Sequence, residues 1–210
     1  MVSVIVPNMN GRSYLPDCLG SLSRQSYKDF EVIVVDNGSS DGSGEFIKKS
    51  FPGVKVVSFS GSLGFSRAVN AGIRESEGEY ISLLNTDTLL EDNWLAELVG
   101  AAELHPESGF FASKILRFDG TVDSAGDGIG RDGLGFNIGS GESSSLNFNN
   151  QGYCFGACAA AALYRRGLFE DIGLFDEDFG NIFEDTDISF RAQLAGRKCL
   201  YAPAAVVYHH

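Results

Sequence analysis

Polar side chains gather directly after three of the apolar runs in the first ninety residues. Pro7, Asn8 and Asn10 follow the first run, Asp36 and Asn37 follow the second, and Asn85, Thr86 and Asp87 follow the last. A carboxylate such as Asp87 can coordinate a hard divalent cation that bridges two phosphates. Asn85, two residues earlier, lies on the same face and can supply a neutral oxygen. Any one of these residues could serve a turn, but together they predict a binding cleft.

A second acidic group, Glu184–Asp187, comes late in the chain and begins a helix-like pattern. Aspartate at the start of a helix is commonly an N-cap, which is the alternative interpretation for Asp185 and Asp187. Crowded carboxylates, however, raise one another's pKa, as a general base requires. The group therefore predicts a source of general-base chemistry.

Regular alternation of strands and helices must position these groups. Short β-branched runs predict buried strands at Val2–Val6, Val32–Val35, Val54–Phe59 and Tyr80–Leu84. Apolar residues at helical spacing predict helices at Leu15–Leu22, Gly42–Ser50, Ala68–Arg74 and Trp94–Ala102. This order is typical of an α/β fold with a mostly parallel central sheet flanked by helices. Ligands of such sheets bind outside the carboxyl ends of the strands, where the first polar clusters stand.

The composition changes after residue 118. Residues 119–152 hold nine glycines and almost no periodicity, so we assign no elements there and expect a functional or mobile segment. Beyond it, Asp185–Ala195 has a helix-like pattern and Ala205–Tyr208 a strand-like one. We expect one domain over residues 1–210, with a nucleotide-binding half of about 1–118 and an acceptor and catalytic half of about 119–210.

The charge balance excludes several classes of protein. The chain has 16 Lys and Arg against 28 Asp and Glu, a net charge of −12, so nucleic-acid binding is not expected. A phosphate-bearing ligand would need a cation or backbone N–H groups.

The four cysteines fit no metal-binding spacing and are expected to be free thiols. The N-terminus lacks the basic start of a signal peptide and no run could span a bilayer, so we expect a cytoplasmic protein with at most peripheral membrane association.

Several common catalytic motifs are missing at the positions where they would act. No Gly-x-Gly-x-x-Gly follows the first strand, and Gly61–Phe65 lacks the Gly-Lys-Ser/Thr ending of a phosphate-binding loop. Gly139–Gly141 is one residue short of a serine-hydrolase elbow and follows no buried strand. A sugar-phosphate nucleotidyltransferase would need a basic loop after the first strand, where only Arg12 stands.

Seven collinear motifs resemble those of glycosyltransferase family 2, which has the GT-A fold, and in particular its rhamnosyltransferase-like subgroup. They are Val4–Gly11, Val34–Ser43, Leu63–Gly72, Leu83–Thr88, Gly173–Glu177, Glu184–Asp187 with Arg191 and Gly196, and Ala202–His209. The resemblance runs in order from Val2 to His210. It implies transfer of a sugar, with inversion, from a UDP- or dTDP-linked donor to an acceptor hydroxyl on a glycan or lipid-linked saccharide in cell-wall or polysaccharide biosynthesis.

The resemblance also implies roles for individual residues. Asp185 would be the catalytic base, and Asp87 and His209 would bind Mn²⁺ or Mg²⁺ on the diphosphate. The implied nucleotide-binding residues are Pro7, Asn8, Asn10, Asp36, Asn37, Gly64, Phe65, Asn70, Asn85 and Thr86. The implied acceptor-side residues are Gly156, Ala157 and Glu184.

Two departures from the family pattern bear on these roles. The family's acidic pair is usually Asp-x-Asp, and Asn85 in the first position keeps an oxygen ligand but removes one negative charge. Relatives usually continue beyond the position of His210 into helices that shape the acceptor site. The alternative function is therefore a nucleotide-sugar-binding domain without turnover.

Overall fold

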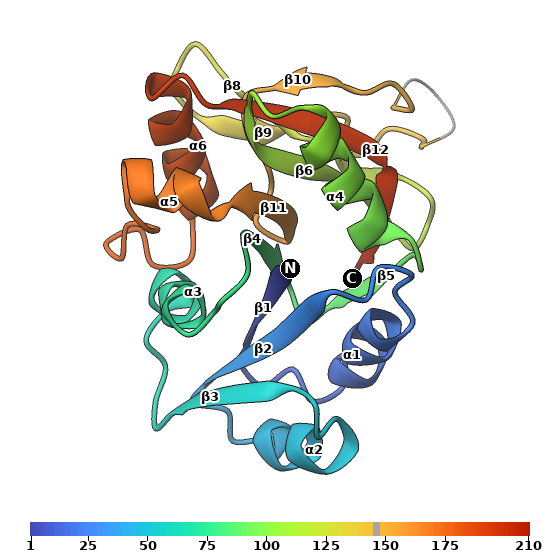
Figure 1. Cartoon of the computed structure of the whole chain (residues 1–210), viewed down its shortest axis with the longest axis vertical. Helices are drawn as coiled ribbons and strands as arrows, with labels where there is room; N and C mark the ends of the chain where they lie inside the picture. Colours follow the sequence, from blue (N-terminus) through green and yellow to red (C-terminus); the bar gives the residue numbers. More distant parts are fainter. Residues whose placement is uncertain (145–147) are drawn as a thin grey trace.

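The computed structural model describes residues 1–144 and 148–210 of the chain (Figure 1). Its helices are α1 (Leu15–Ser23), α2 (Ser43–Ser50), α3 (Phe65–Arg74), α4 (Trp94–Leu104), α5 (Arg166–Ile172) and α6 (Glu184–Leu194). Its strands are β1 (Val2–Asn8), β2 (Phe30–Asn37), β3 (Lys55–Phe59), β4 (Tyr80–Leu84), β5 (Thr88–Leu90), β6 (Ser108–Arg117), β7 (Val122–Ser124), β8 (Asp127–Ile129), β9 (Gly135–Asn137), β10 (Gly152–Cys154), β11 (Ala161–Arg165) and β12 (Lys198–His209).

The first half of the chain forms the parallel part of the main sheet. Strands β3, β2, β1 and β4 lie side by side in that order, and each neighbouring pair is parallel. In this register Asn8 at the end of β1 lies opposite Asp36 at the end of β2. The predicted α/β fold with strands and helices in alternation is confirmed, and the polar clusters after β1 and β2 meet at one edge of the sheet.

The second half extends the same sheet with strands of both directions. Strand β11 runs antiparallel between β4 and β6, and β12 pairs parallel with β6 over most of its length. The sequence analysis missed β6, because a strand buried along nearly all its length shows no alternation of polar and apolar residues. It also predicted only the last third of β12. Cys154 and Cys199 face each other across β10 and β12 as free thiols, with their Sγ atoms 3.5 Å apart.

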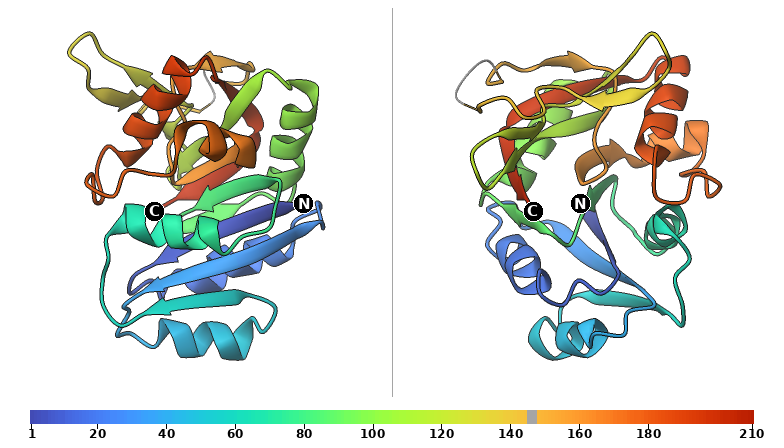
Figure 2. Two further views of the ribbon diagram at one scale, coloured as in Figure 1. Left: turned by 60° about the vertical axis from the view of Figure 1, so that its left-hand side comes forward. Right: turned by 180° about the vertical axis from the view of Figure 1, so that it is seen from behind.

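Helices cover both faces of the sheet. Helices α1, α2 and α4 pack on one face and α3, α5 and α6 on the other, which the turned views of Figure 2 make plain. Trp94 is fully buried on the first face, where its indole N–H donates to Ser113 Oγ at 2.9 Å. Phe110 and Tyr164 stack on the second face with ring centroids 6.0 Å apart. Across the described residues, no helix combines the length and the apolar character that crossing a membrane would require.

The glycine-rich segment 119–152 is more ordered than predicted. Apart from residues 145–147, which lie outside the described residues, it holds β7, β8 and β9 and the first residue of β10. The prediction of a segment without elements is therefore wrong. These strands have three residues each, too few to show a period, and they form because neighbouring backbone pairs with them. Ala125 N–H, for example, donates to the Ile138 carbonyl at 2.9 Å.

Helix α3 packs closely on β1 because Gly72 has no side chain. A Cβ atom built at Gly72 would lie 2.5 Å from Ile5 Cγ2, whereas one at Gly100 in α4 would meet nothing within 4 Å. Both positions are helical. The two glycines therefore form a matched pair in which only the close approach differs.

We expect Gly72→Ala to lower the free energy of unfolding by about 1–3 kcal/mol, because overpacking Ile5 outweighs the gain in helix propensity. Gly100→Ala should raise it by about 0.5–1 kcal/mol, since alanine restricts the unfolded chain and favours the helix. Urea unfolding of both variants measures the difference. Equal changes of the same sign would contradict the close approach of α3 to β1.

Candidate active site

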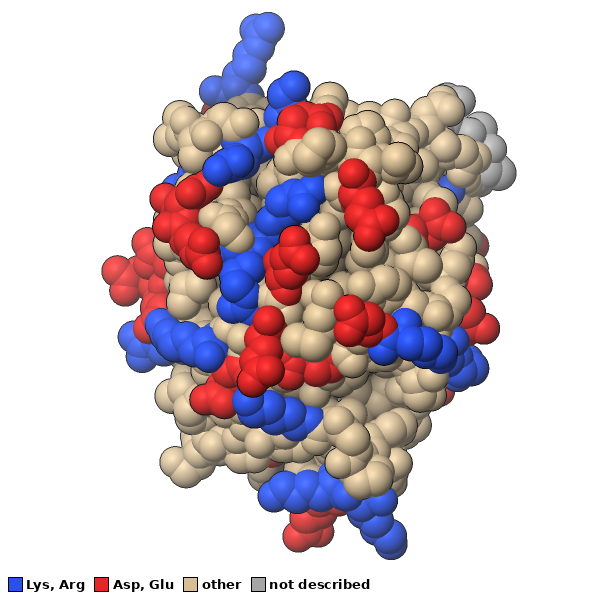
Figure 3. Space-filling view, in the orientation of Figure 1, with Lys and Arg blue, Asp and Glu red and all other residues tan. Residues whose placement is uncertain are grey.

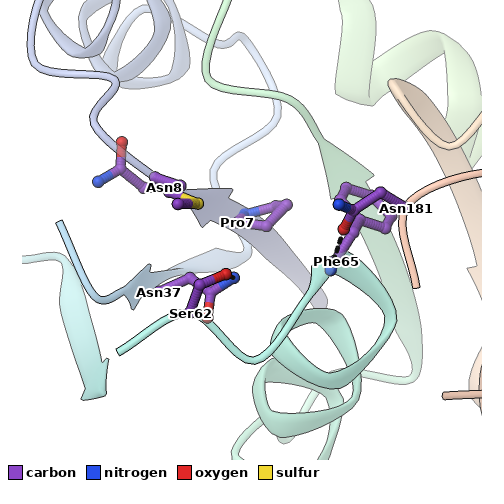
Figure 4. A pocket seen from close by; sticks show the side chains of 7 residues that line it. Pro7, Asn8, Asn37, Ser62, Phe65 and Asn181 are labelled. Atoms are coloured by element: carbon purple, nitrogen blue, oxygen red, sulfur yellow. Dashed lines mark hydrogen bonds between the residues drawn. The ribbon is translucent and has the colours of Figure 1, made fainter. Parts of the chain in front are cut away.

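A pocket of about 250 Å³ opens at the carboxyl ends of β1 and β2 (Figure 4). Its lining comes from four separate parts of the chain: Pro7, Asn8 and Met9 at the end of β1, Asn37 at the end of β2, Ser62 and Phe65 at the entry to α3, and Asn181 before α6. Four of these residues, Pro7, Asn8, Asn37 and Phe65, are among those that the sequence analysis assigns to nucleotide binding, whereas Met9, Ser62 and Asn181 are not. The described residues thus bring together the clusters that follow β1 and β2.

A hydrogen-bond network fixes the floor of this pocket. The Asn8 amide donates to Asp36 Oδ1 at 3.3 Å and to Ser39 Oγ at 3.0 Å. Asn8 and Asp36 are both buried, and Asp36 also accepts from the Ser39 N–H. Asn10 lies outside the lining and accepts from the Ser40 N–H at 2.9 Å. Asp36 and Asn10 therefore shape the pocket indirectly. Asp36 holds the Asn8 side chain, and Asn10 holds the loop after β2 at Ser40.

Asn37 shapes the loop that carries Phe65 into the pocket. Its Oδ1 accepts from the Leu63 N–H at 2.7 Å, and its amide donates to the Gly64 carbonyl at 3.3 Å. Gly64 has a φ of 86°, a conformation that favours glycine, and α3 begins with the next residue. The asparagine side chain thereby substitutes for backbone partners that the loop lacks.

The segment between α5 and α6 is tied onto α3. The Asn70 amide donates to the Phe175 carbonyl at 2.8 Å, and the Phe175 N–H donates back to Asn70 Oδ1 at 3.1 Å. Asn70 is buried, so its amide serves this tie and offers no group to the pocket. At the other end Asn181 Oδ1 accepts from the Phe65 N–H at 2.7 Å. The sequence analysis missed Asn181, because no local pattern brings it to Phe65, 116 residues away in the chain.

His209, on the last strand, lies between two carboxylates. Its Nε2 is 3.3 Å from Asp87 Oδ1, and its Nδ1 is 2.9 Å from Asp123 Oδ2. The hydrogen bonds to Asp123 and Asp87 raise the pKa of His209 to about 9, so the ring is an imidazolium at neutral pH. Burial acts to raise the pKa of Asp87, but the hydrogen bond and charge of His209 outweigh it and lower that pKa. Asp123 was not among the expected site residues, because it lies within the glycine-rich segment.

Asp87 and His209 have the donor atoms that Mn²⁺ or Mg²⁺ would need, a carboxylate oxygen and an imidazole nitrogen. Among residues 1–144 and 148–210, however, no three His, Cys, Asp or Glu side chains converge as a ready metal site. The pair therefore fits a metal that takes its other ligands from a bound diphosphate. Acidic and basic side chains are interspersed on the face that Figure 3 shows.

Asn85 and Thr86, which precede Asp87, support the rim through contacts with neighbouring backbone. The Asn85 N–H donates to the Ala160 carbonyl at 2.9 Å, and its own carbonyl accepts from Thr88 Oγ1. Thr86 Oγ1 would lie 3.0 Å from a Cβ at Gly11, so these two residues are in close contact across the loop after β1. Thr86 and Gly11 thereby join the ends of β1 and β4.

Three carboxyl groups gather at the start of α6. Asp185 accepts from the Thr186 N–H at 2.7 Å and from the Ala159 N–H at 3.5 Å, so it faces the start of β11. Burial raises the pKa of Glu184 to about 7, and no described residue bonds to its Oε2 atom. Burial, with the charge of Asp185, raises the pKa of Asp127 to about 7. Asp127 is a further member of this cluster that the sequence analysis missed.

Gly156 and Ala157 form the packed wall beneath this cluster. Gly156 exchanges backbone hydrogen bonds with Asp127, and a Cβ on it would lie 2.5 Å from Ser189 Oγ of α6. Ala157 is fully buried. In this structure both residues set the position of α6 and present no free surface to an acceptor.

Comparison with known proteins agrees with this architecture. Residues 3–173 match the model of "Glycosyl transferase family 2". The chain is 30% identical over its whole length to an uncharacterized protein, y4gI, of Sinorhizobium fredii, of which it covers 24%. It is 26% identical over its whole length to the N-acetylglucosaminyl-diphospho-decaprenol L-rhamnosyltransferase of Mycobacterium tuberculosis, of which it covers 76%.

The fold is also that of solved glycosyltransferases. The mannosyltransferase PcManGT from Pyrobaculum calidifontis, solved with GDP-Man and Mn²⁺, superposes with a TM-score of 0.75. The match has 21% sequence identity and covers 99% of this chain and 56% of the other. The expected GT-A architecture is thereby confirmed. From its motifs, its fold and the family match, the chain belongs to glycosyltransferase family 2.

Proposed function

We propose that this chain is an inverting, metal-assisted glycosyltransferase. It moves a sugar from a UDP- or dTDP-linked donor to an acceptor hydroxyl on a growing glycan or lipid-linked saccharide. The transfer reaction takes place in the cytoplasm or at the inner face of the membrane, as a step of cell-wall or polysaccharide biosynthesis. The name of the rhamnosyltransferase relative, which acts on a diphospho-decaprenol-linked sugar, supports this substrate class.

One observation carries the proposal: a single segment links the pocket to the acidic cluster. Asn181 lines the pocket after β1 and β2, and Asp185 follows it by four residues at the start of α6. A donor whose nucleoside occupies the pocket would therefore bring its sugar within reach of a carboxylate. This is the arrangement that transfer to an acceptor hydroxyl needs, since the hydroxyl must lose its proton as the new bond forms.

Asp185 is the proposed general base. Its carboxylate is held by two backbone N–H groups, which fix its orientation without supplying a counter-ion. Glu184 and Asp127 beside it are buried, with pKa values near 7, so they carry less negative charge at neutral pH than their number suggests. A base that acts directly on the acceptor leads to one displacement at the anomeric carbon, and hence to inversion.

Asp87, with His209, is the proposed holder of Mn²⁺ or Mg²⁺. A bound divalent cation would neutralise the charge that develops on the diphosphate as the sugar departs. His209 must release its proton before its ring nitrogen can serve as a ligand. In the protonated state it instead presents a positive charge beside Asp87, which holds that carboxylate in place.

The decisive experiment replaces Asp185 by Asn, which keeps the shape and the capping ability of the side chain but cannot accept a proton. We expect turnover to fall about 10²–10⁴-fold with donor affinity nearly unchanged. Nucleoside diphosphate release from a panel of UDP- and dTDP-sugars, with saccharide acceptors, measures the loss. Asp178→Asn, an exposed carboxylate of the preceding segment, is the matched control and should stay within threefold of wild type.

Turnover of Asp185→Asn within threefold of wild type would assign the base to another residue. Donor binding by the wild type with no turnover of any donor would instead favour a nucleotide-sugar-binding domain.

The imidazolium of His209 predicts a pH dependence of stability. Its folded pKa of about 9 lies above the ordinary value of 6.5, so its contribution is complete below pH 6.5 and is lost as the pH rises through 9. We expect the Tm in EDTA to fall between pH 6.5 and 9.5, and His209→Gln to flatten this part of the profile. His105→Gln, at a half-buried histidine that pairs with Glu107, is the control and should keep the wild-type slope. A wild-type slope in His209→Gln would contradict the assignment.

A further inference from the structure

An apolar groove lies beside the acidic cluster, between the β8–β9 hairpin and the start of α6. We call it the α6 groove; its lining is Ile129, Gly133, Leu134, Phe179, Phe183, Thr186, Asp187 and Phe190. Its volume is about 450 Å³, within the range of sites for small organic ligands. It is separate from the pocket at the ends of β1 and β2, with which it shares no residue.

The groove exposes large apolar side chains that a folded protein normally covers. Leu134, Phe179, Phe183 and Phe190 are between 43% and 56% exposed, and all four line this one groove. Single exposed apolar residues are common, but a contiguous set marks a site of interaction. The groove therefore has a surface that gains free energy when a ligand covers it.

Phe183 adds an independent sign of a functional surface. Its φ is 67°, in the left-handed region that a bulky side chain rarely adopts. Such a conformation is strained and persists where surrounding structure requires it. The residue stands directly before Glu184 and Asp185, so its ring lies at the junction of the groove and the acidic cluster.

Two polar side-chain atoms of the groove, Asp187 Oδ2 and Thr186 Oγ1, already have partners, which limits what can bind there. Asp187 Oδ2 accepts from both Nε and Nη2 of Arg191, at 2.9 and 2.7 Å. The Thr186 hydroxyl is directed to Asp185 Oδ1 at 3.5 Å and lies against Gly135. A sugar ring between these apolar walls would find few partners for its hydroxyls, and burying a hydroxyl without a partner is unfavourable. A hydrocarbon chain has no such requirement.

We propose that the α6 groove holds the hydrocarbon chain of a lipid-linked saccharide acceptor, whose sugar lies at Asp185. The groove is continuous with the acidic cluster through Thr186, so sugar and chain follow each other in the order in which a glycolipid carries them. This inference rests on the proposed function and selects, from the two acceptor classes named there, the lipid-linked one. The groove binds the chain by apolar burial, which tolerates hydrocarbons of different detailed shape.

The test uses hexyl, octyl and decyl β-D-glucoside below their critical micelle concentrations, because each joins a sugar to a hydrocarbon chain of known length. Titration calorimetry should show affinity rising about two- to fourfold per added CH₂ group, as expected for partial to complete burial. Phe190→Ser and Leu134→Ser, on opposite walls, should each remove most of this chain-length dependence. Leu194→Ser and Leu104→Ser, at residues 76% and 78% exposed outside the groove, are the matched controls and should keep it.

Circular dichroism verifies that the variants fold, and two variants on different elements keep the test valid should one of them fail to fold. Affinity that does not depend on chain length, or that survives in both groove variants, would overturn the proposal. A dimer in sedimentation equilibrium that dissociates in Leu134→Ser would overturn the proposal as well. The proposal would also be overturned if the protein bound phosphatidylglycerol vesicles, Phe190→Ser abolished this binding, and the glucosides showed no chain-length dependence. That result would assign the groove to contact with a bilayer. UDP and dTDP binding by the same samples tests the proposed function separately.

Discussion

The tie between Asn70 of α3 and Phe175 is the interaction on which the candidate site depends. Two hydrogen bonds join the buried amide to both backbone groups of Phe175, and Asn181 repeats the connection at the Phe65 N–H. Between these points the segment crosses from α5 to α6 without regular structure of its own, so its path depends on contacts with other elements. The tie holds the segment to α3 at Phe175, while Arg191 of α6 donates to the Ile172 and Leu174 carbonyls at its start. The segment thus relates the pocket at the ends of β1 and β2, the proposed nucleotide site, to the carboxylates at the start of α6.

Charge sets the second constraint. A protein with a net charge of −12 places Asp87 and Asp123 on either side of His209, and Asp127 and Glu184 beside Asp185. In the first group a proton on the imidazole compensates the two carboxylates. In the second, burial raises the pKa values of Asp127 and Glu184 and so favours the neutral form of these two acids beside Asp185. The two clusters therefore hold many acids at little electrostatic cost, and a cation bound with a diphosphate at Asp87 would add to this balance.

Local patterns in the sequence predict the parallel part of the fold and the position of the cleft. Strands β1, β2 and β4 are short β-branched runs that end in polar residues. Because the carboxyl ends of parallel strands lie at one edge of the sheet, where ligands bind, Asn8, Asp36 and Asp87 are expected at that edge. Strand β6 was not predicted, because burial on both faces removes the alternation of polar and apolar residues. Strands β7 to β9 were not predicted, because three residues are too few to show such an alternation. Asn181, Asp123 and Asp127 could not be found in this way, since only the tertiary fold brings them to Phe65, His209 and Asp185. Phe65 is 116 residues from Asn181, and His209 is 86 residues from Asp123.

The claim that the tie positions the catalytic segment can be measured most directly in Asn70→Ala. Asn70 is buried and outside the pocket, so its loss removes no contact to a donor. We expect faster amide hydrogen exchange over residues 175–187 and a turnover at least tenfold below wild type, with nucleoside diphosphate affinity within about threefold. Faster exchange over these residues with unchanged turnover would contradict this claim.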